Sequence, residues 1–540
     1  MDRRNFVRFG IASGTLAGPI GATGAPAPAT AVAPRARPRA ESDILDAGVR
    51  EQGAAMAAGT ITSHTLVQRY LARIAAIDKA GPRLNAVIET NPEALTLAQE
   101  RDRERAAGQL RGPLHGIPVL LKDNIATGDR MCTTAGSLAL DGVRASRDAF
   151  VAARLRAAGA VIIGKTNLSE WANMRSTHSV SGWSARGGQT KNPYALDRNP
   201  SGSSSGSAAA IAASLATLAV GTETDGSIVS PASTCGIVGL KPTLGLVSRS
   251  GIIPIAHSQD TAGPMTRSVA DAALMLAAMT GIDFDDAVTK QSNGKVGDYA
   301  AALRPDGLRG KRIGVARNFF GGSTAVDEIV EKELALLAAQ GALLVDVALP
   351  NTDQYGESEM AVLLHEFAPG LQAWLAAYAP HAPVKSMADV IAFNERESAR
   401  EMPYFGQEHL IAGAAKRGRD AREYHEALAN NLRYARAEGI DKILGAHRLD
   451  ALVAPTGGVA WLTDYINGDH YGMSFSSPAA VAGYPHITVP AGHTRGLPVG
   501  LSFVGTAWSE ATLIGMAYAY EQASRRRRAP TFPATVNVKA

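Results

Sequence analysis

The stretch Pro200-Ser-Gly-Ser-Ser-Ser-Gly-Ser-Ala-Ala-Ala210 decides how the chain folds, because it leads directly into an alanine-rich run. Residues 207–220 carry no charged side chain and place Ile211, Leu215 and Leu218 among small residues. Such a composition predicts a helix that is buried inside the protein. A flexible Gly/Ser linker is the alternative interpretation of the serines, but a linker does not run directly into a buried helix.

Short apolar runs on both sides of this stretch predict the strands of a central sheet. These runs lie at residues 117–121, 160–163, 311–315, 342–347, 451–454 and 486–489. Helical patterns alternate with them, as at 61–77 and 326–340. The predicted fold class is therefore α/β, with a mixed central β-sheet flanked by helices and the buried Ala-rich helix after the Ser/Gly-rich loop. Residues 41–540 should form a single domain, in which the more polar region 285–445 forms a variable cap over the site.

Two patterns match motifs of other enzyme classes. Gly159-Ala-Val-Ile-Ile-Gly-Lys-Thr166 has the letters of a Walker A motif, but its variable residues Ala-Val-Ile-Ile are expected to be the strand itself rather than a phosphate-binding turn. Gly202-Ser-Ser-Ser-Gly206 matches the nucleophile elbow of α/β-hydrolases, but the polar stretch 194–200 precedes it where that elbow requires an apolar strand. Neither nucleotide binding nor an α/β-hydrolase fold is expected.

Metal and disulfide chemistry receive little support. None of the 12 histidines lies in a close ligand pair, and structural roles are favoured for His115 and His257. The two cysteines, Cys132 and Cys235, form no metal cluster and no disulfide framework. A single bridge between them stays open, although two unpaired thiols are the preferred interpretation. No metal and no cofactor are predicted.

The N-terminal 40 residues resemble an export signal and its linker. Asp2-Arg-Arg-Asn-Phe-Val-Arg8 resembles a twin-arginine signal and is followed by a mildly apolar stretch and Ala/Pro repeats. Residues 9–34 are uncharged, but glycines and prolines interrupt them, so a cleaved signal is preferred over an uncleaved anchor. We expect the twin-arginine export machinery to deliver the protein to the periplasm or outside the cell, with no membrane segment in the mature form.

The charge of the chain gives no case for nucleic-acid binding. The first 40 residues hold six Lys and Arg against one acid, which leaves 48 basic and 49 acidic residues in the remainder. The basic excess therefore belongs to the leader. The basic run Arg525–Arg528 is expected to be a solvated helix end rather than a docking patch.

Lys122, Ser203 and Ser227 are the candidate catalytic residues. A serine nucleophile needs a base for its proton and donors for the oxyanion. Lysine can be that base only when neutral, so its pKa of about 10.4 must fall by roughly three units, which burial beside the apolar residues Val119–Leu121 would achieve. Asp123 follows Lys122 on the predicted strand and should therefore face the other side.

Together these segments resemble the amidase signature family. The resemblance is carried by Gly112–Asn124, Gly164-Lys-Thr-Asn-Leu-Ser-Glu-Trp171, the Gly/Ser-rich segment, Gly221–Ser233 and Gly239-Leu-Lys-Pro-Thr243. It extends from about residue 45 to 285 and resumes from Asp450 to Glu521. Within the family the chain is most similar to bacterial peptide amidases, which remove the C-terminal amide of peptides. That narrower resemblance rests on Ser181–Gln189, Gly221–Ser227, Ser258–Pro264 and Gly505–Glu510.

The resemblance implies a role for each candidate residue. Ser227 would be the nucleophile, Lys122 the base, and Ser203, after a cis peptide bond from Gly202, the bridging serine that relays the proton. The oxyanion hole would be formed by the backbone N–H groups of Thr224, Asp225, Gly226 and Ser227. The common family pattern has glycine at position 225 and arginine at 229, whereas this chain has Asp225 and Val229. The aspartate fits the peptide-amidase subgroup, so it narrows the range of expected substrates to peptide amides.

The expected function is that of a cofactor-independent serine amidohydrolase. It would convert a carboxamide, preferably the C-terminal amide of a peptide, to a carboxylate and ammonia through an acyl-enzyme. The alternatives are an aryl acylamidase or another small-amide amidase of the same family, and, from a different class, an inactive binding protein on this scaffold. A component of an aminoacyl-tRNA amidotransferase is a further rival, which export from the cytoplasm would argue against.

Overall fold

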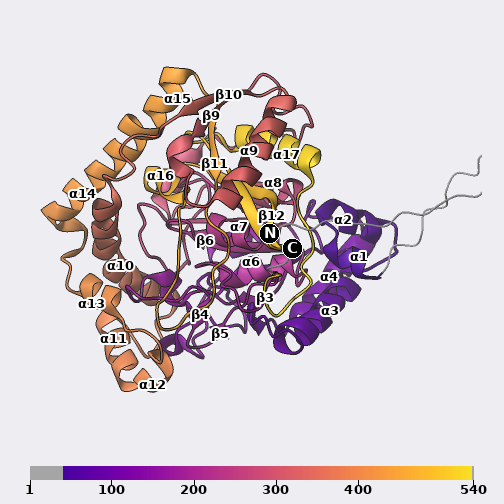
Figure 1. The fold of residues 1–540 in the computed structure, drawn as a ribbon. Helices are drawn as coiled ribbons and strands as arrows, with labels where there is room; N and C mark the ends of the chain where they lie inside the picture. The colour runs from indigo at the N-terminus through magenta and orange to yellow at the C-terminus, as the bar shows by residue number, and fades with distance from the viewer. Residues whose placement is uncertain (1–40, 538–540) are drawn as a thin grey trace, which may run out of the picture. The chain divides into compact units, whose positions relative to one another are not determined.

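The computed structural model describes residues 41–537 and gathers the predicted strands into one mixed sheet (Figure 1). The export signal and linker predicted for residues 1–40 lie outside the described residues. Among the described residues the sheet has 11 strands in the order β1-β3-β2-β6-β8-β7-β12-β13-β11-β9-β10. β2 pairs in parallel with β3 and β6, whereas β12 pairs antiparallel with β7 and β13. The predicted α/β fold class with a mixed sheet is confirmed.

The strands of the sheet have the following bounds. They are β1 (Val87–Thr90), β2 (Pro118–Lys122), β3 (Val161–Thr166), β6 (Leu218–Glu223), β7 (Val238–Lys241), β8 (Thr261–Thr266), β9 (Arg312–Ala316), β10 (Leu343–Val347), β11 (Ala451–Pro455), β12 (His486–Thr494) and β13 (Leu497–Val504). A separate hairpin consists of β4 (Trp183–Ser184) and β5 (Gly188–Gln189).

Helices from along the whole described chain surround the sheet. They are α1 (Glu41–Asp46), α2 (Val49–Ala57), α3 (Ser63–Arg73), α4 (Ala94–Ala106), α5 (Phe150–Ala157), α6 (Ser205–Ala212), α7 (Val229–Thr234), α8 (Val269–Met279), α9 (Thr324–Ala339), α10 (Gly356–Tyr378), α11 (Met387–Arg396), α12 (Ser398–Glu401), α13 (Glu408–Ala414), α14 (Arg422–Leu432), α15 (Asp441–His447), α16 (Ser476–Ala482) and α17 (Glu510–Ser524). None of the described helices is both long enough and apolar enough to span a membrane.

The alanine-rich run is helical only in its first part. Helix α6 is buried along its whole length, as predicted. It ends at Ala212, however, and Ser214 has a positive φ of 55° that breaks the helix. Leu218–Val220, predicted as helix, belong to strand β6, which pairs with β2 and β8. A continuous apolar run fits a buried strand as well as a buried helix, so the periodicity could not separate the two.

The segment with Walker A letters is a strand, as predicted. Three of its four variable residues, Val161–Ile163, fall in β3, which pairs with β1 and β2. Lys165 is fully buried, and its Nζ donates to the carbonyl oxygens of Ile125 (2.7 Å) and Cys132 (3.1 Å). A lysine bound to backbone carbonyls inside the core is not available to a phosphate. Cys132 and Cys235 are both free thiols, in agreement with the preferred interpretation.

Region 285–445 is more than a cap. Its first part supplies β9 and β10, which pair with each other and join the sheet through β11. Only its second part, from α10 onward, is a layer of helices, in which α10 packs against α13 and α14 (Figure 1). The region therefore combines a layer of helices with two strands of the central sheet, at the runs 311–315 and 342–347 that the sequence predicts as strands of that sheet.

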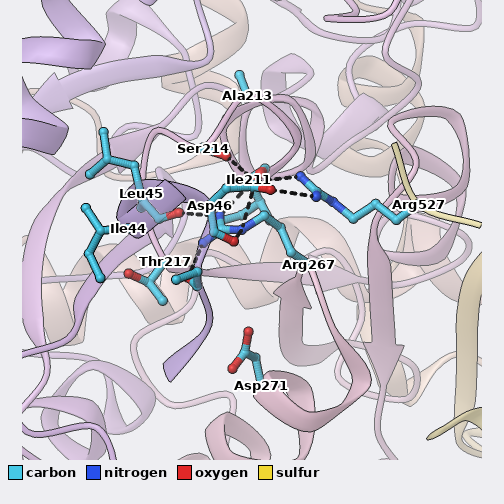
Figure 2. A network of polar contacts seen from close by, with 12 residues as sticks. Ile44, Leu45, Asp46, Ile211, Ala213, Ser214, Thr217, Arg267, Asp271 and Arg527 are labelled. Carbon is cyan, nitrogen blue, oxygen red and sulfur yellow. Dashed lines mark hydrogen bonds and ion pairs between the residues drawn. The ribbon is translucent and has the colours of Figure 1, made fainter. Parts of the chain in front are cut away.

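A polar network ties the first helix to the core and to the C-terminal segment (Figure 2). Arg267, directly after β8, donates to the carbonyl oxygens of Asp46 (3.2 Å), Ala47 (3.0 Å) and Ala216 (2.7 Å). Arg527 forms two hydrogen bonds with the Asp46 carboxylate, at 2.9 and 3.1 Å. The prediction of a solvated helix end is therefore wrong in detail. α17 stops at Ser524, before the basic run, and Arg526 and Arg527 form ion pairs with Glu333 and Asp46.

We expect Arg267→Ala to lower the free energy of unfolding by about 3 kcal/mol. Its side chain is 4% exposed, and its loss leaves buried carbonyl groups without donors. Arg527→Ala is the matched control and should cost less than about 1 kcal/mol, because the Asp46 side chain that it pairs with is 40% exposed. Urea denaturation of both variants tests this, and equal losses would contradict the assignment of the network's stability to Arg267.

Candidate active site

Ser227 opens onto a cavity of about 320 Å³, a size typical of small-ligand sites. The cavity is lined by Ala172, Asn173, Met174, Ser181, Ser201, Gly202, Thr224, Asp225, Ser227, Ile255, Met360, Leu363, His409, Asp469, Tyr471, Ser474, Ser476 and Ser477. Ser227 is 8% exposed, whereas Lys122 and Ser203 are fully buried. The predicted residues therefore run from the protein interior outward to the cavity wall, with Ser227 at the accessible end.

Lys122 is the last residue of β2, and its amine lies between two hydroxyl groups. Nζ donates to Ser203 Oγ at 2.7 Å and to Thr222 Oγ1 at 2.8 Å, with a longer contact of 3.2 Å to the Thr222 carbonyl oxygen. Thr222 comes from β6, the parallel neighbour of β2. The register of β2 and β6 thus places the Lys122 amine, the Thr222 hydroxyl and the Ser203 hydroxyl next to one another.

Burial lowers the pKa of Lys122 to about 7. Desolvation is the main cause, because a charged amine loses its water there, and the more distant negative charges of Asp260 and Glu223 only partly oppose it. The predicted fall of roughly three units is therefore matched in direction and size. Near neutral pH a substantial fraction of the molecules holds Lys122 as a free amine, which can accept a proton.

Asp123 faces away from Lys122, as strand alternation predicted. Its carboxyl group accepts a hydrogen bond from the Thr134 hydroxyl and lies 3.7 Å from the Arg186 guanidinium. Asp123 is thereby placed on the side of Lys165 and Arg186, whose positive charges counteract the rise that burial causes in the pKa of its carboxyl group. Because the Asp123 carboxylate points away, it does not raise the pKa of Lys122.

The two serine-bearing segments touch through their backbones. The Ser204 N–H donates to the carbonyl oxygen of Ser227 at 3.1 Å, and the peptide bond between Gly202 and Ser203 is cis. Within residues 41–537 the Ser227 hydroxyl takes part in no hydrogen bond. Ser203 is therefore bonded to Lys122, while Ser227 stays free to meet a ligand in the cavity.

The loop before Ser227 presents backbone N–H groups to the cavity. In the described part of the chain, the N–H groups of Asp225, Gly226 and Ser227 donate no hydrogen bond. Gly226 has a φ of +74°, and a side chain there would lie 3.1 Å from Ser476 Oγ. Thr224, the first of the four predicted donors, also lines the cavity. Consecutive free N–H groups beside a hydroxyl form a site for a developing negative charge.

Two carboxylates hold this loop from behind. Glu223 Oε2 accepts from the N–H groups of Ile228 (2.7 Å) and Val229 (3.0 Å), at the start of α7. The Thr224 hydroxyl donates to Asp260 Oδ1 at 2.6 Å. Because both ends of the loop are bonded to buried groups, its N–H groups are held in place before any ligand binds.

The far wall of the cavity contains residues that the sequence did not indicate. Met360 and Leu363 come from α10, His409 from α13, and Asp469 and Tyr471 from the segment between β11 and α16. These segments lie outside the motifs and follow no recognisable pattern. Only the general expectation that region 285–445 reaches over the site pointed to α10 and α13.

A buried arginine holds α13 against the signature segment. Arg175 donates to Glu170 Oε1 at 2.7 Å and to the carbonyl oxygens of Glu401 (2.6 Å) and Phe405 (3.0 Å). The Arg175 carbonyl oxygen in turn accepts from the His409 N–H at 3.1 Å. The guanidinium thus fixes the position of the His409 side of the cavity.

Comparison with known proteins shows similarity along most of the chain. A family model described as amidase matches residues 65–514, a range that includes every residue of the cavity wall. A probable amidase of Arabidopsis thaliana is 41% identical over 500 residues, which cover 91% of this chain and 92% of that protein. A glutamyl-tRNA(Gln) amidotransferase component of Ralstonia nicotianae is 38% identical, with coverage of 87% and 96%.

Solved structures give closer matches. The X-ray structure of native peptide amidase from Stenotrophomonas maltophilia is 56% identical and covers 90% of this chain and 98% of its own, with a TM-score of 0.86. The structure of the peptide amidase in complex with the competitive inhibitor chymostatin is 55% identical, with coverage of 89% and 98% and a TM-score of 0.87. The shared fold thus extends over nearly all of the described chain.

The lowered pKa of Lys122 has a consequence for stability. The folded pKa of about 7 lies below the unfolded value of about 10.4, so between these pH values the unfolded chain binds more protons. The contribution of Lys122 to stability therefore rises with pH across this window. Relative to Lys122→Met, the wild type should gain up to about 4 kcal/mol between pH 7 and pH 10.

Urea denaturation at several pH values measures this difference. Lys332→Met, at an exposed position on α9, is the control and should leave the pH dependence of stability unchanged. A Lys122→Met variant with the same pH dependence as the wild type would show that the folded amine keeps its proton.

Proposed function

The chain belongs to the amidase family and hydrolyses amide bonds, and we propose that its substrate is the C-terminal carboxamide of a peptide. The observation that carries this proposal is the buried amine of Lys122, bonded to Ser203 and placed behind the cavity-facing Ser227. The similarity to peptide amidases, one of them bound to a competitive inhibitor, supports the choice of substrate.

In the proposed reaction Ser227 attacks the carbonyl carbon of the substrate amide. Its hydroxyl proton passes to Ser203 while the proton of Ser203 passes to the neutral amine of Lys122, so that the lysine ends as an ammonium. The same relay then returns a proton to the amide nitrogen, and the C–N bond breaks to release ammonia. A water molecule attacks the acyl-enzyme by the same route and yields the carboxylate and free Ser227.

The oxyanion formed in both steps would lie against the loop of residues 224–227. The free N–H groups of Asp225, Gly226 and Ser227 can donate to it without rearrangement, because Glu223 and Asp260 hold the loop. Each such donor typically contributes 10²- to 10³-fold to the rate. No step of the proposed reaction requires a metal or an organic cofactor.

We expect the purified protein to release ammonia from an amidated dipeptide, and Ser227→Ala to lower kcat by at least about 10⁴-fold. Because only the neutral Lys122 can accept the relayed proton, kcat/KM should rise with pH through an apparent pKa of about 7. Ammonia release measured beside aniline release from an anilide separates the alternatives. Aniline alone would favour an aryl acylamidase, and no product from either would favour an inactive binding protein.

We also propose that residues 1–40 direct export by the twin-arginine route. The support is the pair Arg3-Arg4 before an uncharged stretch. Export of the protein would separate it from aminoacyl-tRNA, although amidotransferase components are among the relatives.

We expect the double variant Arg3→Lys and Arg4→Lys to be retained inside a bacterial host, which immunoblots of cell fractions would measure. The control pair Arg35→Lys and Arg37→Lys should be exported, and equal export of both variants would contradict the proposal.

A further inference from the structure

Two carboxyl groups meet in the wall beside the proposed oxyanion site. Asp225 belongs to the loop before Ser227, and Glu359 lies on α10. Their side chains are in hydrogen-bonding contact. Ser477 Oγ donates to Asp225 Oδ2 at 2.6 Å, whereas Asp225 Oδ1 is buried and receives no hydrogen bond from the other described residues. Ser476 also acts on the Asp225 carboxyl group, and Glu359 is the acid in contact with it.

Glu359 is tied to the same loop by a second route. The Gln259 side-chain N–H group donates to Glu359 Oε1 at 2.8 Å and to the carbonyl oxygen of Thr224 at 3.3 Å. α10 thus reaches the loop both through Gln259 and through Asp225. A change in the protonation of Glu359 would therefore alter the contacts of both Thr224 and Asp225.

Two ionised carboxylates in contact repel each other, so the pair needs a proton or a cation. In the described part of the chain, the charged and titratable groups that act on the pair are Lys241 on β7, Glu223 on β6, and the phenols of Tyr355 and Tyr471. Lys241 is the single cation in this set, and it also faces Glu223 and Glu510. Burial raises the pKa of Asp225 and raises that of Glu359 well above its usual range. A shared proton is the remaining way to satisfy the contact.

We propose that Glu359 is a positioning residue, which shares one proton with Asp225 and so holds the N–H groups of residues 225–227 in the geometry needed by the oxyanion. This inference rests on the proposed amidase reaction. Loss of the proton leaves two negative charges in contact. Their repulsion moves the loop of residues 225–227 away from α10, and it also places extra negative charge beside the developing oxyanion. Activity should then fall at alkaline pH, on the side opposite to the limb set by Lys122.

Glu359→Gln tests this inference, because an amide N–H can donate to Asp225 at every pH. We expect kcat of Glu359→Gln at neutral pH to stay within about threefold of the wild type, and its alkaline decline to vanish or move up by at least about one pH unit. Glu359→Ala, which cannot donate, should lower kcat at least about tenfold. Glu357→Gln, an exposed acid on the same helix, is the control and should keep the wild-type profile.

Infrared spectroscopy supplies a readout that does not depend on activity. In the difference between the infrared spectra of the wild type and Glu359→Gln at neutral pH, the C=O stretch of one protonated, buried carboxyl group should be lost, whereas Glu357→Gln should keep it. If the wild type hydrolyses no amide, the proposed function fails, while the infrared band still tests the shared proton. A wild-type alkaline limb that persists in Glu359→Gln, or no loss of the band, would overturn the inference.

Discussion

The amine of Lys122 is buried away from water, and the other groups of the site are placed so that this amine can be neutral. A buried ammonium is costly, and no carboxylate among residues 41–537 touches this amine, so the charge is avoided rather than paired. The groups that do touch Lys122 are the hydroxyls of Ser203 and Thr222 and one carbonyl oxygen. Hydroxyl partners can donate to a neutral amine as well as accept from a charged one. This environment therefore supports both states that a proton-accepting lysine must visit.

The order of strands explains why chain-distant residues meet there. β2 and β6 run in parallel, so Lys122 at the end of one lies beside Thr222 near the end of the other. The chain that leaves β6 forms the loop of residues 224–227 directly above this point. Ligand sites of α/β proteins commonly form where parallel strands end, for this reason. The serine loop before α6 completes the arrangement, because α6 packs against both β2 and β6.

Sequence reasoning succeeded where local chemistry was distinctive and failed where long-range packing decided. The strand runs at 117–121 and 160–163 were readable because continuous apolar residues ended at glycine or a polar residue, and the position of Asp123 followed from strand alternation alone. Residues 218–220 were misread because a buried strand and a buried helix share the same composition. His409 and Asp469 reach the cavity from segments with no periodic pattern, held by Arg175 and by Ser181 through contacts that no local signal encodes.

Burial acts in opposite directions on the two kinds of titratable group around Ser227. It favours the neutral amine at Lys122 and the protonated carboxyl in the Asp225–Glu359 pair, so both effects reduce the number of charged groups in the resting site. In the proposed reaction a negative charge forms at the oxyanion while Lys122 becomes positive. At an effective dielectric constant of about 20, an extra unit charge at any distance below about 10 Å from the oxyanion would raise its energy by more than about 1.6 kcal/mol, enough to slow the reaction more than tenfold. In the proposed arrangement a proton held by Glu359 removes that repulsion, so that an aspartate can lie two residues before the proposed nucleophile without opposing its chemistry.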